Sequence, residues 1–450
     1  IRADVVELSS DAYEGRGPGT EGDRKTQTYL ISRLKEMGLQ PGAADNSWRQ
    51  EFELIALNAQ QPDTWKFNTP NGLQTYQQGT DFVVAAGKQA ATATLEQAQL
   101  VFVGYGIQAP EYDWDDYKGV DVSGKVLVMM NNDPDWDPDL FGGEMRMYYG
   151  RWTYKYEIAA KLGAAGVIII HTDPSAGYPW QVVETSWTGP QFELPNEGEP
   201  TIEIKGWMSN TSTAALFASA GQNLDSLRQQ ASSKNFQPLE LPITTDLTLP
   251  ITMTSNTSAN ILARIGGGDL ADEVVVFTAH HDHLGKGVAT TPGEDVIYNG
   301  ALDNATGVAS VLAIGRAFSQ LPSQSRRSLL FAFVGAEEQG LLGSLYLALH
   351  PPVAPGKLAA AVNMDGAQIH GRSLDISYVG YGRSTVDQAA QMAADLQGRV
   401  IKGDQDPSKG YFYRSDHFSL AKIGVPSLNF EGGEDLRNGG IEAGIAFGEI

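Results

Sequence analysis

The chain has 450 residues, of which 54 are acidic and 32 are basic, so that its formal charge is -22. A charge of this sign repels nucleic acids and anionic lipid surfaces, and no run of about 18 apolar residues, the length that spans a bilayer, occurs. The absence of cysteine excludes disulfides, thiolate zinc ligands and a cysteine nucleophile. At this length we expect two domains, or one large domain with an insertion.

The first predicted element is an amphipathic helix over residues 23–38. Leu30 and Leu34 recur at helical spacing, and Gly38 is a typical C-terminal stop. The glycine-rich turn at residues 14–22, just before this helix, lacks the preceding strand and the Lys-Ser/Thr ending of a phosphate-binding loop. We therefore expect no phosphate site there.

The composition changes at about residue 97, where short apolar runs begin to alternate with long polar loops that contain Trp and Pro. The predicted elements are strands at 99–106, 124–130 and 166–170 and helices at 156–162 and 213–220. The Asp-rich loop at 133–139 lacks the central Gly and the final Glu of a calcium-binding loop, so we expect it to be solvated. We interpret residues 96–250 as an inserted α/β domain that divides another domain into residues 1–95 and 251–450.

Three apolar runs beyond the insertion end at acidic or imidazole side chains. In chain order, the runs 274–279, 329–336 and 358–364 lead to His280, to Glu337 and Glu338, and to Asp365. Asp303 lies between the first two runs. Such runs are typical of buried parallel strands, and ligands bind at the carboxyl ends of these strands in open α/β sheets. Imidazole together with carboxylates suits zinc or a similar divalent ion, so the sequence predicts a metal site.

The adjacent residues Glu337 and Glu338 suit hydrolysis at two metal ions. Such a reaction needs two ions about 3.5 to 4 Å apart that are bridged by one carboxylate. It also needs a carboxylate that binds no metal but moves the proton of the attacking water. Because adjacent residues that leave a strand point in different directions, one glutamate can bind metal while its neighbour faces the substrate.

Four segments resemble the successive motifs of the co-catalytic dizinc exopeptidases, namely residues 280–282, 299–309, 335–344 and 363–365. This family holds the bacterial leucine aminopeptidases and, with an inserted protease-associated domain, the glutamate carboxypeptidases. The turn at 15–20 and the insertion around 155–170 also look like bacterial members with that domain. The resemblance covers nearly the whole chain. It implies a mixed, largely parallel sheet flanked by helices, with residues 96–250 as the protease-associated domain.

The resemblance also implies a role for each motif residue and two zinc ions as cofactors. By this resemblance, His280 is a terminal ligand, Asp282 is the carboxylate that orients His280, and Asp303 is the bridging ligand. Glu337 is the general base, Glu338 is a terminal ligand of one ion, and Asp365 is a ligand of the other ion.

One ligand of the family pattern is missing. The family completes its metal site with a histidine in a Tyr-His segment downstream of the strand that residues 424–428 resemble, and no such segment follows here. We expect the chain to be shortened at its C-terminus, so that the second zinc ion is weakly bound or absent. The alternative is that His417 takes the place. His281 and His283 are expected to be structural, because strand alternation turns them away from the side of His280.

The resemblance favours an aminopeptidase whose substrate is a peptide. The alternatives are a carboxypeptidase or dipeptidase of the same fold, then a single-zinc glutaminyl cyclase, then a non-catalytic binding ectodomain that has lost its ligands. Tyr149 and Arg151 of the insertion, together with Tyr411, are the candidates for substrate binding. An acidic, cysteine-free zinc enzyme fits a bacterial periplasmic or secreted protein.

Overall fold

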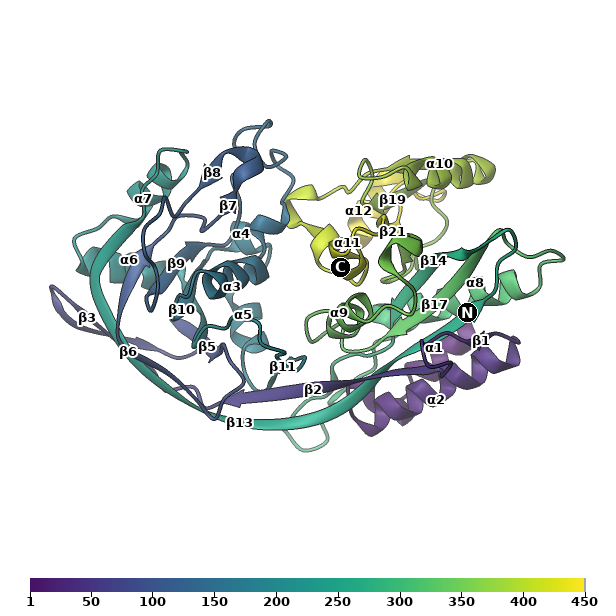
Figure 1. Ribbon diagram of the computed structural model, residues 1–450, viewed down its shortest axis with the longest axis horizontal. Coiled ribbons are helices and arrows are strands. Elements are labelled where there is room, and N and C mark those ends of the chain that lie inside the picture. The colour runs from purple at the N-terminus through teal and green to yellow at the C-terminus, as the bar shows by residue number, and fades with distance from the viewer. Residues whose placement is uncertain (449–450) are drawn as a thin grey trace. The chain divides into compact units, whose positions relative to one another are not determined.

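The computed structural model describes residues 1–448, which fold into two compact units (Figure 1). The first unit contains Ile1–Leu54, Asn256–Gln405 and the chain from Arg414 on. The second unit contains Ile55–Ser255 and Asp406–Tyr413. Within residues 1–448, no helix combines the length and the apolar character needed to cross a membrane.

The first unit is built on a mixed sheet whose central strands are parallel. In spatial order the strands are β1 (Gln40–Pro41), β13 (Leu239–Ile265), β17 (Arg327–Val334), β14 (Leu270–His280), β18 (Leu358–Asn363), β21 (Ser427–Gly432), β19 (Asp375–Val379) and β20 (Val400–Lys402). The strands β17, β14, β18 and β21 run parallel, whereas β13 and β19 pair antiparallel with them from the two sides. The predicted mixed, largely parallel sheet flanked by helices is confirmed.

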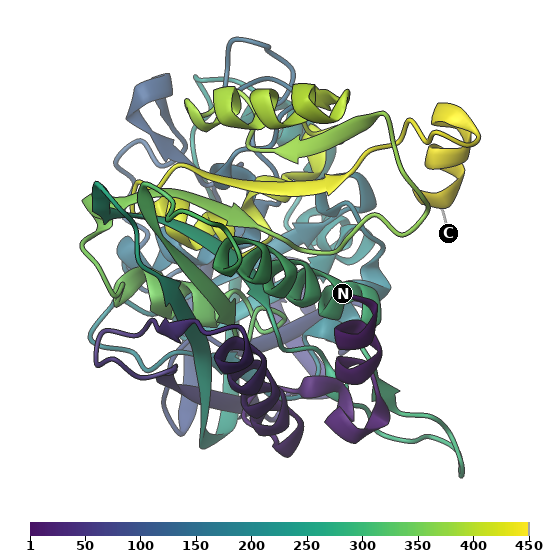
Figure 2. The same cartoon turned by 90° about the vertical axis from the view of Figure 1, so that its right-hand side faces the viewer.

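The side chains of β17 alternate between two apolar layers, which explains why helices cover both faces of the sheet. Leu329, Phe331 and Phe333 pack with the helices α1 (Arg2–Leu8), α2 (Glu21–Glu36) and α8 (Thr306–Ser319). Leu330, Ala332 and Val334, which alternate with them along the strand, pack with α9 (Leu342–Leu349) and α11 (His417–Lys422). Figure 2 shows α2 and α8, purple and green, lying on the same face of the sheet. The remaining helices of this unit are α10 (Val386–Gln397) and α12 (Gly440–Gly448).

The helix predicted after the glycine-rich turn is confirmed as α2. The hydroxyl of Thr20 caps its first turn by accepting a hydrogen bond from the backbone N–H of Asp23. Gly38, just beyond the helix, has a φ of 76°. That left-handed conformation favours glycine at the end of a helix.

The second unit is an α/β module with its own sheet. The strands β6 (Thr92–Phe102), β9 (Val126–Met130), β10 (Gly166–His171) and β12 (Ile204–Ser209) are parallel neighbours in that order, and β5 (Phe82–Ala86) pairs antiparallel with β12. The apolar faces of α3 (Trp152–Lys161), α6 (Asn210–Ser219) and α7 (Leu224–Ala231) pack on this sheet. The three strands and two helices that the sequence predicted in this region are all present.

The first boundary of the second unit differs from the expected one at residues 95 and 96. Residues 55–95 belong to this unit because β5 pairs with β12, and because β3 (Thr64–Thr69) pairs with β4 (Gly72–Gln77) and with β13. The other boundary follows Ser255, which lies inside the 27-residue strand β13. The sequence could not show these boundaries, because the pairing partners lie far apart along the chain.

Candidate metal centre

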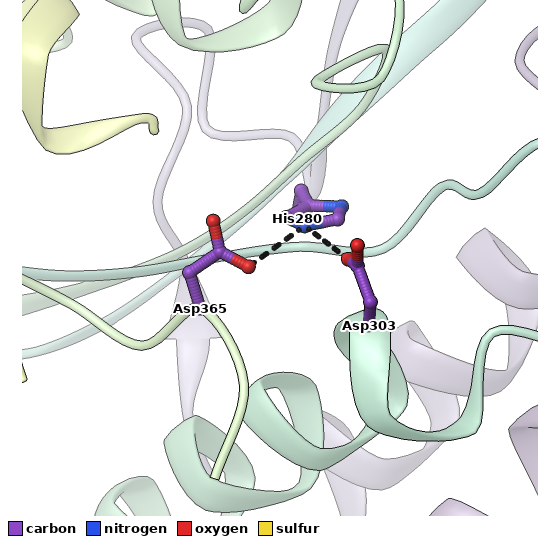
Figure 3. A group of neighbouring side chains, drawn as sticks. All are labelled: His280, Asp303 and Asp365. Atoms are coloured by element: carbon purple, nitrogen blue, oxygen red, sulfur yellow. Dashed lines mark hydrogen bonds and ion pairs between the residues drawn. The ribbon is translucent and has the colours of Figure 1, made fainter. Parts of the chain in front are cut away.

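The carboxyl ends of β14 and β18 bring His280 and Asp365 together, and the kinked turn Ala301–Ala305 adds Asp303 (Figure 3). The Nε2 atom of His280 lies 3.1 Å from Oδ1 of Asp303 and 3.2 Å from Oδ1 of Asp365. The side chain of His280 is 1% exposed, whereas that of Asp303 is 56% exposed. This first donor group therefore has a buried imidazole and one carboxylate open to solvent.

A second donor group shares Asp303 with the first. His283 Nδ1 lies 2.6 Å from Glu338 Oε1, and single ligand atoms of His283, Asp303 and Glu338 lie within 4.8 Å of one another. His283, which the sequence predicted to be structural, therefore belongs to a group of side chains that could hold a metal ion, and its role stays a prediction. Strand β14 ends at His280, so strand alternation does not govern residues beyond it. The concentration of three histidines within residues 280–283 was the signal that could have indicated His283.

Asn304 joins the two loops that carry the aspartates of the first donor group. Its Nδ2 donates to the carbonyl of Met364 at 2.9 Å. Its Oδ1 accepts from the backbone N–H groups of Gly307 at 3.0 Å and Gly366 at 2.9 Å. Asn304 is fully buried, and these three hydrogen bonds fix the spacing of the loops.

Asp365 is held through Ser415, which is bonded in turn to Asn363 at the end of β18. The hydroxyl of Ser415 donates to Oδ2 of Asp365 at 2.6 Å, and Asn363 Nδ2 donates to the Ser415 hydroxyl at 2.7 Å. Although burial acts to raise it, the pKa of Asp365 is lowered from its ordinary value by the hydrogen bonds and charge of its neighbours, chiefly His280. The carboxylate is therefore kept in the ionised form that binds metal.

Asp282 organises the turn that presents the two adjacent glutamates. Its Oδ1 accepts from the backbone N–H of Glu337 at 3.0 Å, and its Oδ2 accepts from that of Glu338 at 3.3 Å. Asp282 is fully buried, and its Oδ1 lies 3.7 Å from Nδ1 of His280, beyond hydrogen-bond distance. In this structure Asp282 therefore acts mainly on the glutamates, a role that the sequence did not indicate.

Glu337 lies beside the first donor group, and neither group within the described residues includes it. Its Oε2 is 4.0 Å from Nε2 of His280, and its side chain is 12% exposed. Burial, opposed by His280 but reinforced by the charges of Asp416 and Asp365, raises the pKa of Glu337 well above its ordinary value. A carboxylate with raised proton affinity beside metal-binding groups is suited to proton transfer.

His417, the alternative ligand considered from the sequence, begins α11 and is fully buried. The two donor groups found in residues 1–448 do not contain it. His283 instead supplies the imidazole of the second group. A sequence pattern cannot distinguish these two histidines, because both follow an acidic residue and only the course of the loop decides which one reaches Glu338.

The three candidates for substrate binding lie in the second unit. The phenol of Tyr149 donates to the carboxylate of Glu111, Arg151 precedes the first residue of α3, and the ammonium of Lys409 lies 5.8 Å from the ring centre of Tyr411. Contact of Tyr149, Arg151 and Tyr411 with a substrate stays a prediction.

The two donor groups fit a pair of divalent ions. Each group offers one imidazole and two carboxylates, which are donors that zinc prefers, and the shared Asp303 is what a bridged pair of ions requires. Burial alone would lower the pKa of His280, but the surrounding carboxylates, led by Glu337, raise it well above its ordinary value. The site therefore favours a positive charge at this position, which a proton supplies when no cation is bound.

The part of the chain that carries both donor groups is similar to known proteins. Residues 260–446 match the family model described as peptidase family M28. Leupeptin-inactivating enzyme 1 of Streptomyces exfoliatus is 29% identical over 169 residues, which are 37% of this chain and 36% of that protein. A vacuolar membrane protease of Candida dubliniensis is 29% identical over 125 residues, which are 28% of this chain and 12% of that protein.

The chain matches only part of these curated relatives, from 12% to 36% of their lengths. Among solved structures, an aminopeptidase from Aneurinibacillus sp. strain AM-1 superimposes with a TM-score of 0.55 at 20% sequence identity. The superposition covers 98% of this chain and 87% of the aminopeptidase. This likeness shows a shared fold.

Proposed function

We propose that the protein is a zinc-dependent exopeptidase, and specifically an aminopeptidase, that binds two ions at the candidate metal centre. The observation that carries the proposal is the pair of donor groups that share Asp303. The family M28 match of residues 260–446 and the similarity to a vacuolar membrane protease support hydrolysis of peptides. The sequence resemblance to bacterial leucine aminopeptidases is the reason for favouring cleavage at the amino end.

The chain supplies the proton transfer that such a reaction needs. Two zinc ions, when bound, would lower the pKa of a water and polarise the scissile carbonyl. Glu337 would take a proton from the attacking water on its side-chain oxygen and give it to the amine that leaves. Asp282 holds the backbone of Glu337 during this transfer. The exposed carboxylate of Asp303 marks the side of the centre that is open to solvent.

The proposal is tested by metal content together with peptides blocked at one end. Elemental analysis of the zinc-loaded protein should give about two ions per chain. A tripeptide with free ends and the same peptide amidated at its carboxyl end should be cleaved, whereas the peptide acetylated at its amino end should not. Cleavage of the free and the acetylated peptide, but not of the amidated one, would show a carboxypeptidase. A content of one zinc ion per chain, together with cyclisation of an N-terminal glutamine, would show a glutaminyl cyclase. A protein that binds no metal and turns over no substrate would be a binding protein.

His283→Ala is expected to lower the zinc content from about two ions to about one per chain, because the second donor group loses its only imidazole. His417→Ala is the matched control, since it removes a histidine that lies outside both groups of the described chain. It should keep both ions. Loss of an ion from His417→Ala with full occupancy in His283→Ala would reverse the assignment.

Asp282→Ala is expected to weaken zinc binding by about 10- to 100-fold, the usual effect of removing a group that orients metal ligands. The variant loses the two hydrogen bonds that fix the backbone of Glu337 and Glu338. A titration of the metal-free protein with zinc against a competing chelator measures the affinity. Unchanged affinity would mean that the glutamate turn holds its shape without Asp282.

Two expectations from the sequence stay predictions. One is that the α/β insertion is a protease-associated domain. The other is that the protein acts in the bacterial periplasm or outside the cell.

A further inference from the structure

Arg16 belongs to the glycine-rich turn at residues 14–22, where no phosphate site is expected. It ends the short helical turn Asp11–Arg16 and is 1% exposed. A guanidinium buried to this extent destabilises the fold unless its N–H groups find acceptors. It donates to four backbone carbonyls, those of His281 at 2.9 Å, Leu8 at 2.7 Å, Asn299 at 2.7 Å and Gly300 at 2.8 Å.

These hydrogen bonds reach both segments that supply the second donor group. His281 lies two residues before His283, and Gly300 lies three residues before Asp303. In addition, the backbone N–H of His283 donates to the carbonyl of Arg16 at 3.3 Å. The side chain and the main chain of Arg16 therefore connect the backbone next to His283 with the backbone next to Asp303.

The packing around Arg16 leaves little freedom for movement. A Cβ atom built at Gly15 would lie only 2.2 Å from the carbonyl oxygen of Gly285. A Cβ atom built at Gly300 would lie 2.5 Å from Nη2 of Arg16 and 2.6 Å from Cγ of His283. Glycine is required at both positions because the backbone approaches its neighbours this closely. The turn, the guanidinium and His283 thus form one close-packed contact.

The positive charge of Arg16 is also favourable at this position, which faces carboxylates of the centre. Burial lowers the pKa of Arg16 to about 10, and the charges of Asp282, Asp303 and Glu338 oppose that decrease. The guanidinium therefore remains protonated at neutral pH beside three carboxylates of the centre. Its positive charge offsets part of their mutual repulsion when no ion is bound.

We propose that Arg16 is a positioning residue for the second donor group, an inference that rests on the proposed function. Arg16 fixes the backbone at 281–283 and at 299–300, and so holds His283 and Asp303 in place before an ion binds. A site that is ordered in advance loses less conformational entropy when it binds its ligand. Lysine cannot substitute fully, because its single ammonium does not have the planar array of five N–H donors that reaches carbonyls in several directions.

The test compares the wild-type chain with R16K, R16Q and the control R33Q. Arg33 also lies in the N-terminal segment and is partly buried, but it pairs with Asp4 at 2.9 Å and Glu36 at 2.6 Å instead of bonding near the centre. Zinc affinity is measured by titration against a chelator. Backbone hydrogen exchange is measured on the metal-free proteins, so that the result does not depend on activity or on zinc.

The expected result is that R16K and R16Q weaken one of the two zinc ions by about 10- to 100-fold. Both should speed amide exchange at residues 281–283 and 297–304, and around Leu8, whose carbonyl also accepts from Arg16, without changing exchange elsewhere in the first unit. The control R33Q should do neither. Wild-type protein that binds no zinc would refute the proposed function, and the exchange data would then decide the role of Arg16 alone.

Two outcomes would overturn the inference. One is unchanged zinc affinity and unchanged local exchange in a folded R16Q or R16K. The other is faster exchange throughout the unit, or an R16K that does not fold, since either would show a general role in folding. If only R16Q fails to fold, R16K gives the answer.

Discussion

Glu337→Gln is expected to lower turnover by about 10² to 10⁴, the range for loss of a general acid-base group, while zinc content stays nearly unchanged. Neither donor group of the described chain includes Glu337, yet its Oε2 lies 4.0 Å from His280 at the edge of the first group. Glutamine keeps the size of the side chain but cannot take up a proton. Steady-state kinetics with saturating peptide and elemental analysis after dialysis measure the two effects.

The adjacent residue provides a matched control for this variant. Glu338→Gln makes the same chemical change one position later, where the side chain contacts His283 at 2.6 Å. It should lose zinc from the second donor group, because a neutral amide is a much weaker zinc donor than a carboxylate. If Glu337→Gln lost zinc and Glu338→Gln kept it, the roles of the two glutamates would be exchanged.

Asp303→Ala is expected to remove most of the zinc from both sites. Asp303 is the one residue common to the two donor groups found in residues 1–448, so neither group keeps three donors without it. Its side chain is 56% exposed, so the fold should be retained, which circular dichroism of the metal-free variant checks. Elemental analysis after dialysis measures the loss of zinc.

Asp365→Ala is the matched control for the shared ligand. It removes an aspartate from the first donor group only, and the second group keeps His283, Asp303 and Glu338. About one ion per chain should remain in this variant, compared with nearly none in Asp303→Ala. Equal zinc retention in the two variants would show that Asp303 does not bridge the ions.

The first donor group and the two glutamates could be predicted from the amino-acid sequence. The apolar runs that precede His280, Glu337 and Asp365 are buried strands, and the carboxyl ends of neighbouring parallel strands must meet at one edge of a sheet. The site therefore follows from local patterns once the strands are known to be parallel. The amphipathic helix α2 was predictable for a similar reason, since apolar spacing and a glycine stop are local properties.

The parts of the centre that depend on loops and on distant segments could be found only in the folded chain. His283 lies beyond the end of β14, so no periodicity of the chain fixes its direction. Arg16 reaches the carbonyl of His281 across 265 positions of sequence, and the strands within residues 55–95 take their place by pairing with much later strands. Local composition and periodicity do not encode such contacts. They form when the packed sheet brings segments remote in sequence within hydrogen-bonding distance.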